Sequence, residues 1–156
     1  MKTFPSREEG AFSKVTCISL TDEFLYYGTE AGTVEVFYLS EWVMLSGSEL
    51  RLSNGIKKIY PNYNGTRCVV IDSMNQVLMF NPIGANNTAN QGIIKFENAP
   101  SNIVNVIWDI SEKNVVLLYD GKCLHTYVYV SVSMRGEYLT KLGPVDGKYS
   151  IVYSVY

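Results

Sequence analysis

The chain has 156 residues and a formal net charge of −2, and its acidic and basic residues are scattered evenly. No basic cluster exceeds the pair Lys57–Lys58, so the sequence predicts no binding to nucleic acid or to an anionic membrane surface. The longest apolar run, Val115–Tyr119, is far shorter than the ~20 residues of a membrane-spanning helix, so we expect no direct membrane insertion. The 12 Tyr and 6 Phe favour β-strands over helices.

Residues 1–13 are charged and lack the apolar stretch of a signal peptide, so we expect an N-terminal linker there. A first unit follows over residues 14–53. Its pattern alternates between apolar and polar positions, as in TVEVFYL at 33–39, which is typical of strands with one wet face. The strands of this unit are expected at residues 14–20, 24–29, 33–39 and 42–45.

The same order recurs in a second unit over residues 54–98 and a third over 99–142. First strands begin near Val15, Ile56 and Ile103, at offsets of 41 and 47 residues, which match the ~40–50 residues of a four-stranded propeller blade. Their strands are expected at residues 55–61, 67–72, 76–81 and 92–96, and at 102–109, 114–119, 122–130 and 136–142.

Turn signals separate these strands. The pairs Asn64–Gly65 and Asp120–Gly121 predict type I′ hairpins, in which both central residues have positive φ. Residues 82–91 predict a mobile, variable loop, and residues 143–156 a turn and one strand that starts a fourth blade. The predicted fold class is therefore all-β: about three four-stranded antiparallel blades of a WD-type β-propeller plus one extra strand, in an incomplete ring.

An incomplete ring raises a physical problem. Propellers usually carry four to eight blades, so that every blade face has a neighbour. Three blades leave two apolar faces, each expected to exceed the ~300–600 Å² of the largest apolar patch on a typical soluble monomer. Two explanations stay open: the chain is a fragment of a longer protein, which we favour, or it closes by pairing with another chain.

The sequence offers few candidates for chemistry. His125, the one histidine, lies within a predicted strand with no Asp or Ser motif nearby, so we interpret it as structural or solvent-facing. Cys17, Cys68 and Cys123 are too dispersed for a zinc site and are interpreted as reduced, buried thiols. We therefore predict no catalytic, cofactor-binding or metal residues, no cofactor and no enzymatic activity.

Aspartates recur at the predicted strand ends, at positions 22, 72, 109 and 120. The simplest interpretation is that each accepts hydrogen bonds within its own turn. Asp72 and Asp120 also fit loosely the aspartate that braces a WD-type blade between its second and third strands, and Thr29 fits less well.

The Trp-Asp dipeptide that names WD repeats should close a third strand. Here Trp108–Asp109 ends a first strand instead. The third-strand positions read Phe37–Tyr38, Phe80–Asn81 and Tyr127–Val128, so the blades are degenerate: the large aromatic is kept and the Asp is lost.

Three segments, Val15–Phe37, Gly55–Asp72 and His125–Val130, resemble the WD repeat-containing protein 19 family, the large β-propeller subunits of intraflagellar transport complex A. The resemblance covers most of residues 15–142 and weakens across 82–91. It implies a protein with two propellers and a helical solenoid that assembles with other complex A subunits, in the cilium and cytoplasm. It also implies a role in dynein-driven retrograde transport and cilium assembly. This sequence has no solenoid and too few blades for one full propeller, so we expect a partial chain.

The predicted function is thus a non-enzymatic protein-interaction scaffold of that complex. Two alternatives remain: a propeller segment of another coat-like vesicle-trafficking subunit, and a self-contained small β domain that binds a ligand or is an enzyme. Candidate partner-binding loops are residues 62–64, 73–75 and 82–91, and the sequence does not choose among them.

Overall fold

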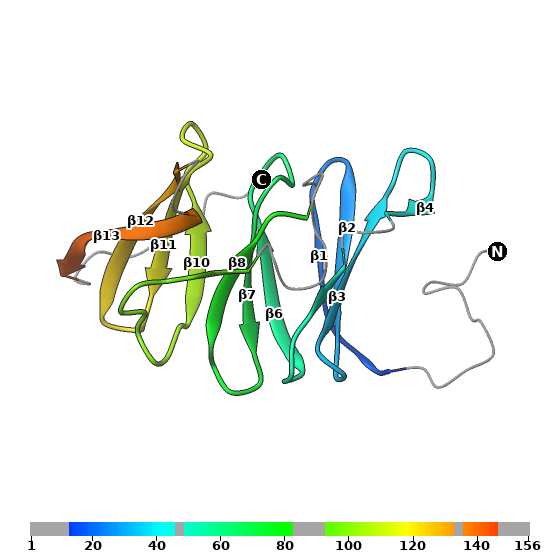
Figure 1. The fold of residues 1–156 in the computed structure, drawn as a ribbon, viewed down its shortest axis with the longest axis horizontal. Coiled ribbons are helices and arrows are strands. Elements are labelled where there is room, and N and C mark those ends of the chain that lie inside the picture. The colour runs from blue at the N-terminus through cyan, green and yellow to red at the C-terminus, as the bar shows by residue number, and fades with distance from the viewer. Residues whose placement is uncertain (1–12, 46–48, 83–92, 133–135, 147–156) are drawn as a thin grey trace.

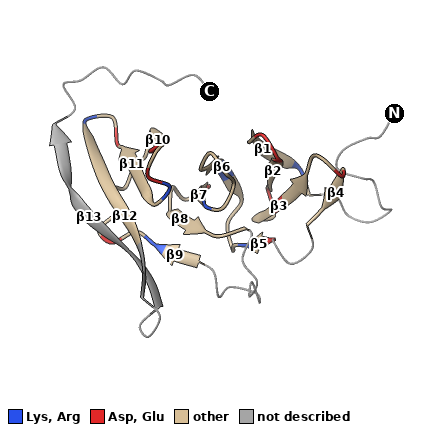
Figure 2. Cartoon of the chain, turned by 90° about the horizontal axis from the view of Figure 1, so that it is seen from above, with Lys and Arg blue, Asp and Glu red and all other residues tan. Residues whose placement is uncertain are grey.

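A computed structural model describes residues 13–45, 49–82, 93–132 and 136–146 of the chain. Within these ranges the secondary structure consists of 13 β-strands, and no helix occurs. The strands form three antiparallel sheets that follow one another along an open arc (Figures 1 and 2). This arrangement confirms the predicted all-β fold of propeller blades in a ring that is not closed.

The first sheet has five strands, and β3 lies near the middle of the sheet. β5 pairs with the first residues of β3, and β4 pairs with its last residues. Its strands are β1 (Val15–Leu20), β2 (Phe24–Thr29), β3 (Thr33–Tyr38), β4 (Val43–Met44) and β5 (Leu50–Arg51).

The second and third sheets each have four strands in simple up-and-down order. The second sheet contains β6 (Ile56–Pro61), β7 (Cys68–Asp72), β8 (Val77–Phe80) and β9 (Ile93–Lys95). The third contains β10 (Asn105–Trp108), β11 (Val115–Tyr119), β12 (Cys123–Val132) and β13 (Gly136–Asp146). In Figure 2, β1, β6 and β10 lie along one side of the arc, and we call them the inner strands.

The C-terminal region differs from expectation in one respect. Residues 143–146, predicted as a turn that leads to a fourth blade, continue β13, and Pro144 stands opposite His125. A proline is tolerated there because β13 is an edge strand of its sheet. Residues 147–156 lie outside the described residues, as do 1–12 of the predicted linker and 83–91 of the predicted loop. The fourth blade and the residue limits of the linker and blades therefore stay predictions.

The two hairpin signals identified the turns correctly but not their type. Gly65 has φ of 71° and Gly121 has φ of 94°, whereas neither Asn64 nor Asp120 has positive φ. Type I′ turns are therefore wrong for both positions, since that type requires positive φ at both central residues. The preceding Asn and Asp instead use their side chains to bind the turn, as Asn64 Oδ1 does with the Thr66 amide at 3.2 Å.

Two layers of core side chains hold the three sheets together. Between the first and second sheets, Tyr26 is fully buried and its hydroxyl donates to the Gly65 carbonyl at 2.9 Å. A Cβ on Gly28 would lie 2.5 Å from Ile56 Cγ2, so the two sheets approach there as closely as a glycine allows.

Between the second and third sheets, the indole Nε1 of Trp108 donates to the Tyr60 carbonyl at 2.8 Å. Arg67 lies over the ring of Tyr129, with its guanidinium carbon 4.3 Å from the ring centre. A hydrogen bond thus crosses each layer, and a cation–π contact also crosses the second. The apolar packing of the two layers supplies most of the stabilisation.

Candidate functional site

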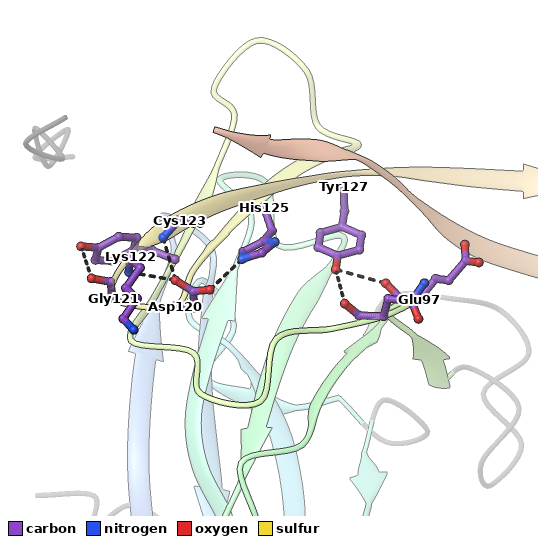
Figure 3. A network of polar contacts seen from close by, with 9 residues as sticks. Glu97, Asp120, Gly121, Lys122, Cys123, His125 and Tyr127 are labelled. Atoms are coloured by element: carbon purple, nitrogen blue, oxygen red, sulfur yellow. Dashed lines mark hydrogen bonds and ion pairs between the residues drawn. The ribbon is translucent and has the colours of Figure 1, made fainter. Parts of the chain in front are cut away.

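Asp120 is the centre of the best-defined polar cluster, in the β11–β12 turn (Figure 3). Its Oδ1 accepts from the amides of Cys123 at 2.7 Å and Lys122 at 2.8 Å, and its Oδ2 lies 2.8 Å from His125 Nε2. The hydrogen bond from the Cys123 amide, followed by that from His125, lowers the pKa of Asp120 to about 2. The carboxylate is therefore charged and committed to its own turn.

The equivalent turns of the other sheets are built in the same way. In the β7–β8 turn, Asp72 Oδ1 accepts from the amides of Met74 at 2.9 Å and Gln76 at 2.8 Å, and Oδ2 accepts from Asn54 Nδ2 at 2.9 Å. In the β2–β3 turn, Thr29 Oγ1 accepts from the Thr33 amide at 3.2 Å. These contacts confirm that Asp72 and Asp120 brace their turns. Thr29 braces its turn with an uncharged hydroxyl, which makes a weaker interaction.

The aspartates at the opposite ends of the strands behave differently from each other. Asp109 Oδ1 accepts from the Glu112 amide at 2.8 Å and from the Ser111 amide and hydroxyl at 2.9 Å each. These bonds, that from Glu112 first, lower the pKa of Asp109. Asp22 is exposed, and the side chain that binds its turn is Thr21, whose Oγ1 accepts from the Phe24 amide at 3.0 Å. The prediction that each aspartate accepts hydrogen bonds within its own turn is confirmed for Asp109. It is wrong for Asp22, because Thr21 makes the side-chain hydrogen bond of the β1–β2 turn.

His125 is buried and directed at Asp120, 2.8 Å away, so the expectation that no Asp lies nearby is wrong, and the role is structural and not solvent-facing (Figure 3). Its Nδ1 is buried without a hydrogen-bond partner in the part of the chain that the structure describes. Beside it, the Tyr127 hydroxyl donates to the Glu97 carbonyl at 3.1 Å, and burial raises the pKa of Tyr127. No serine or cysteine nucleophile contacts the imidazole in this described cluster, so its geometry does not correspond to a catalytic triad.

The three cysteines are free, and only one of them is fully buried. Cys68 is inaccessible, and burial raises the pKa of its thiol well above the ordinary value. Cys17 and Cys123 are partly buried, so the prediction of buried thiols is right for Cys68 and too strong for the other two.

In the described residues, no three His, Cys, Asp or Glu side chains gather as possible metal ligands. No apolar helix of membrane-spanning length occurs there either.

A groove of about 560 Å³ lies where the three inner strands end. Its walls are the last residues of β1 and β6, the whole of β10, and the turns that follow these strands, at positions 19–22, 60–63 and 105–110. In antiparallel sheets these turns stand at the strand ends opposite the turns that Thr29, Asp72 and Asp120 brace. We call this feature the inner groove.

The inner groove has an apolar lining and a negative border. Leu20, Tyr63 and Ile110 are large side chains that remain 62%, 54% and 57% exposed, and all three line the groove. Asp22 and Asp109 are part of the same lining, which contains no Lys or Arg. Exposed apolar groups gathered in a concavity mark interaction surfaces and ligand-binding grooves.

The structure separates the three loops that the sequence offered as partner-binding candidates. The 62–64 turn contributes Asn62 and Tyr63 to the inner groove. The 73–75 turn lies at the opposite strand ends and exposes Met74. Of 82–91, only Pro82 lies within the described residues. The sequence analysis did not identify Leu20 and Ile110 as groove residues. Each is an apolar residue directly beside a polar turn, and this pattern could have indicated them.

Three antiparallel four- or five-stranded sheets that pack face to face around inner strands define a β-propeller segment. Comparison with solved structures agrees. The chain superposes on the "Structure of Kluyveromyces lactis Hsv2p" with a TM-score of 0.69 and 13% identity, over 89% of this chain and 50% of that one. It superposes on the computationally designed Ika4 protein with a TM-score of 0.54 and 16% identity, over 77% and 69% of the two chains. These likenesses establish the fold alone.

Residues 1–151 match the family described as "WDR19 second beta-propeller", and the chain belongs to this family. It is 29% identical over 137 residues to WD repeat-containing protein 19 of Homo sapiens, and 27% identical over 138 residues to that of Mus musculus. The matches cover 86% and 87% of this chain, which spans about a tenth of the length of these curated relatives. These matches confirm the resemblance to the WD repeat-containing protein 19 family that the sequence analysis inferred.

Proposed function

We propose that the chain is a non-enzymatic protein-interaction scaffold of intraflagellar transport complex A, acting in retrograde ciliary transport and cilium assembly. The match to the WDR19 second β-propeller over residues 1–151 is the observation that carries this proposal. Its partners would be other complex A subunits, and its location the cilium and the cytoplasm. The coarser role, a β-propeller built for protein contacts, follows from the family itself.

We place the partner contact at the inner groove. Leu20, Tyr63 and Ile110 offer large apolar surfaces from three different sheets, so a partner segment that lies there would contact all three sheets at once. Burial of exposed apolar side chains of this size stabilises a complex by roughly 1.5–3 kcal/mol each before the costs of association. The hydrogen bonds of Asp109 hold one wall of the groove in shape.

The test uses the tagged chain expressed in ciliated cells. We expect it to localise to cilia and to co-purify identified complex A subunits. The double variant L20E/I110E, which places carboxylates on the apolar lining, should lose these subunits. The matched control is M74E, since Met74 is 67% exposed in a turn at the opposite strand ends and should retain them.

Failure of the unmodified chain to recover any complex A subunit would refute the assignment to this complex. Recovery by the unmodified chain and equally by L20E/I110E would leave the complex assignment standing and exclude the inner groove as the contact surface.

A further inference from the structure

The inner groove combines exposed apolar side chains with negative charge that nothing on its lining balances. Asp22 and Asp109 are the charged side chains of the described lining, and both are acidic. They stand in the turns that follow β1 and β10, next to the exposed apolar side chains of Leu20 and Ile110. The charge and the apolar surface therefore belong to one site.

The carboxylates of this site have oxygens that are free to bind a partner. Asp22 is exposed and accepts no hydrogen bond from the described residues, since Thr21 makes the side-chain bonds of its turn. Asp109 accepts from Ser111 and Glu112 with Oδ1, whereas Oδ2 accepts nothing from the described part of the chain. Those bonds to Oδ1, that from the Glu112 amide first, lower the pKa of Asp109. The Asp109 side chain is therefore charged at neutral pH, with one oxygen unused.

Two hydrogen-bond donors of the lining are already committed within the chain. Trp108 Nε1 donates to the Tyr60 carbonyl at 2.8 Å. Asn62 is fully buried, and its side-chain amide donates to Thr66 Oγ1 at 3.1 Å. The groove thus offers a partner charged acceptors more readily than donors.

A partner that covers the apolar side chains also takes water away from the carboxylates beside them. A carboxylate that loses water without gaining a cation or a donor destabilises the complex. A neutral apolar segment over Leu20 and Ile110 would leave Asp22 and Asp109 unpaired, and an acidic segment would be repelled by them. A segment that carries positive charge offsets this loss.

Given that a partner lies in the inner groove, as the proposed function holds, we propose that the segment it inserts is basic as well as apolar. Its Lys or Arg side chains pair with Asp22 and Asp109, and its apolar side chains contact Leu20, Tyr63 and Ile110. An Arg can pair with Asp22 through two parallel hydrogen bonds, because both carboxylate oxygens are free. Such an association is sensitive to salt, which screens exposed charges.

Quantitative co-purification of complex A subunits with the tagged chain tests the charge of the partner. We expect D22K to lower recovery about three- to tenfold, since it removes one ion pair and adds a repulsive charge. Raising NaCl from about 0.15 M to about 0.5 M should lower recovery by the unmodified chain. The variant D22N/D109N keeps an oxygen acceptor for each turn but no charge, so its lower recovery should not respond to salt.

E23K is the matched control, because it makes the same change of charge at the next residue. Glu23 is exposed and is not part of the groove lining, so recovery should stay within about twofold of the unmodified chain. L20A/I110A shortens two apolar side chains without a change of charge and should lose the subunits at both salt concentrations. Circular dichroism checks that every variant is folded.

Equal recovery by D22K and E23K would overturn the basic partner, as would recovery that rises with D22K or does not respond to salt. If L20A/I110A still loses the subunits in those cases, the inner groove remains the contact surface and only the charge of the partner is wrong. An unmodified chain that recovers no complex A subunit would refute the proposed function and the basic partner with it. The two failures are therefore distinguishable.

Discussion

Asp72 and Asp120 illustrate how a single carboxylate fixes a turn at the residue scale. Each accepts two backbone amides with Oδ1 and a side-chain donor with Oδ2, so that the whole carboxylate is used inside the protein. A hydrogen bond to a charged group contributes roughly 1.5–3 kcal/mol, more than a neutral one. These two acidic residues therefore stabilise the turns of their own blades.

Asp120→Asn should destabilise the chain at neutral pH by about 1–2 kcal/mol, a value reduced from the full range because the side chain is partly exposed. The folded pKa of about 2 lies below the ordinary 3.8, so the stabilisation is present above about pH 4 and is lost as the pH falls toward 2. Urea unfolding at pH 7, 4 and 2 should show the two proteins converging.

Asp22→Asn is the control for that series, because Asp22 is exposed and Thr21 makes the bonds of its turn. Its unfolding should follow the unmodified chain at every pH. A difference between Asp120→Asn and the unmodified chain that stayed constant down to pH 2 would contradict the explanation.

The cysteines should differ in reactivity. Cys68 is fully buried, and burial raises the pKa of its thiol, so little thiolate is present or accessible. We expect iodoacetamide to modify Cys123 in the folded chain, Cys17 more slowly because partial burial also raises the pKa of its thiol, and Cys68 only after unfolding, as peptide mass spectrometry would show. Labelling of Cys68 at the same rate as Cys123 would mean that the second sheet opens readily.

At the scale of elements, the sequence predicted most of the strands because hydrophobic alternation and turn residues agreed. β2, β7 and β11 were expected within one residue of their observed limits. Their polar turns carry the Asp or Thr that braces them, and local chemistry and tertiary contacts thus point to the same boundaries.

Elements that depend on distant contacts were not predictable in this way. β5 has two residues, and only its pairing with Thr33 and Val34 makes it a strand. Pro144 signals a turn, yet it lies within β13 because an edge strand needs no amide donor there. The inner groove was missed for the same reason: Leu20 and Ile110 lie 90 residues apart in the sequence, and only the packing of the sheets brings them together.

Tyr26→Phe tests the polar contact between the first two sheets. Loss of the hydroxyl leaves the buried Gly65 carbonyl without its donor, and we expect a loss of about 1–2 kcal/mol in the free energy of unfolding. Tyr63→Phe is the matched control, because Tyr63 is 54% exposed and should change stability by less than about 0.5 kcal/mol. Equal effects in chemical denaturation would show that the Tyr26 bond contributes nothing specific.

For the whole molecule, the position of a sheet in the arc decides how well it is covered. The second sheet has a neighbour on each face, and all five residues of β7 are buried. Among the equivalent second strands, β2 is buried except at the partly buried Leu25, and β11 alternates between partly buried and buried residues. Of the three described sheets, the second therefore has the most completely buried central strand.

Hydrogen exchange should follow that order. Amides of β7 are expected to exchange more slowly than those of β11, the equivalent strand of the third sheet, because opening the second sheet disrupts two core layers and opening the third disrupts one. Mass spectrometry of peptic fragments at a fixed protein concentration measures this. Uniform exchange across the three sheets would contradict a central core.

The braced turns and the inner groove stand at opposite ends of the same strands, and this has an evolutionary consequence. If the inner groove binds the partner as proposed, substitutions at Leu20, Tyr63 or Ile110 alter what it recognises, yet they touch none of the bonds by which Thr29, Asp72 and Asp120 brace their turns. Selection can therefore change the binding specificity of such a blade array at one end while the other preserves the fold.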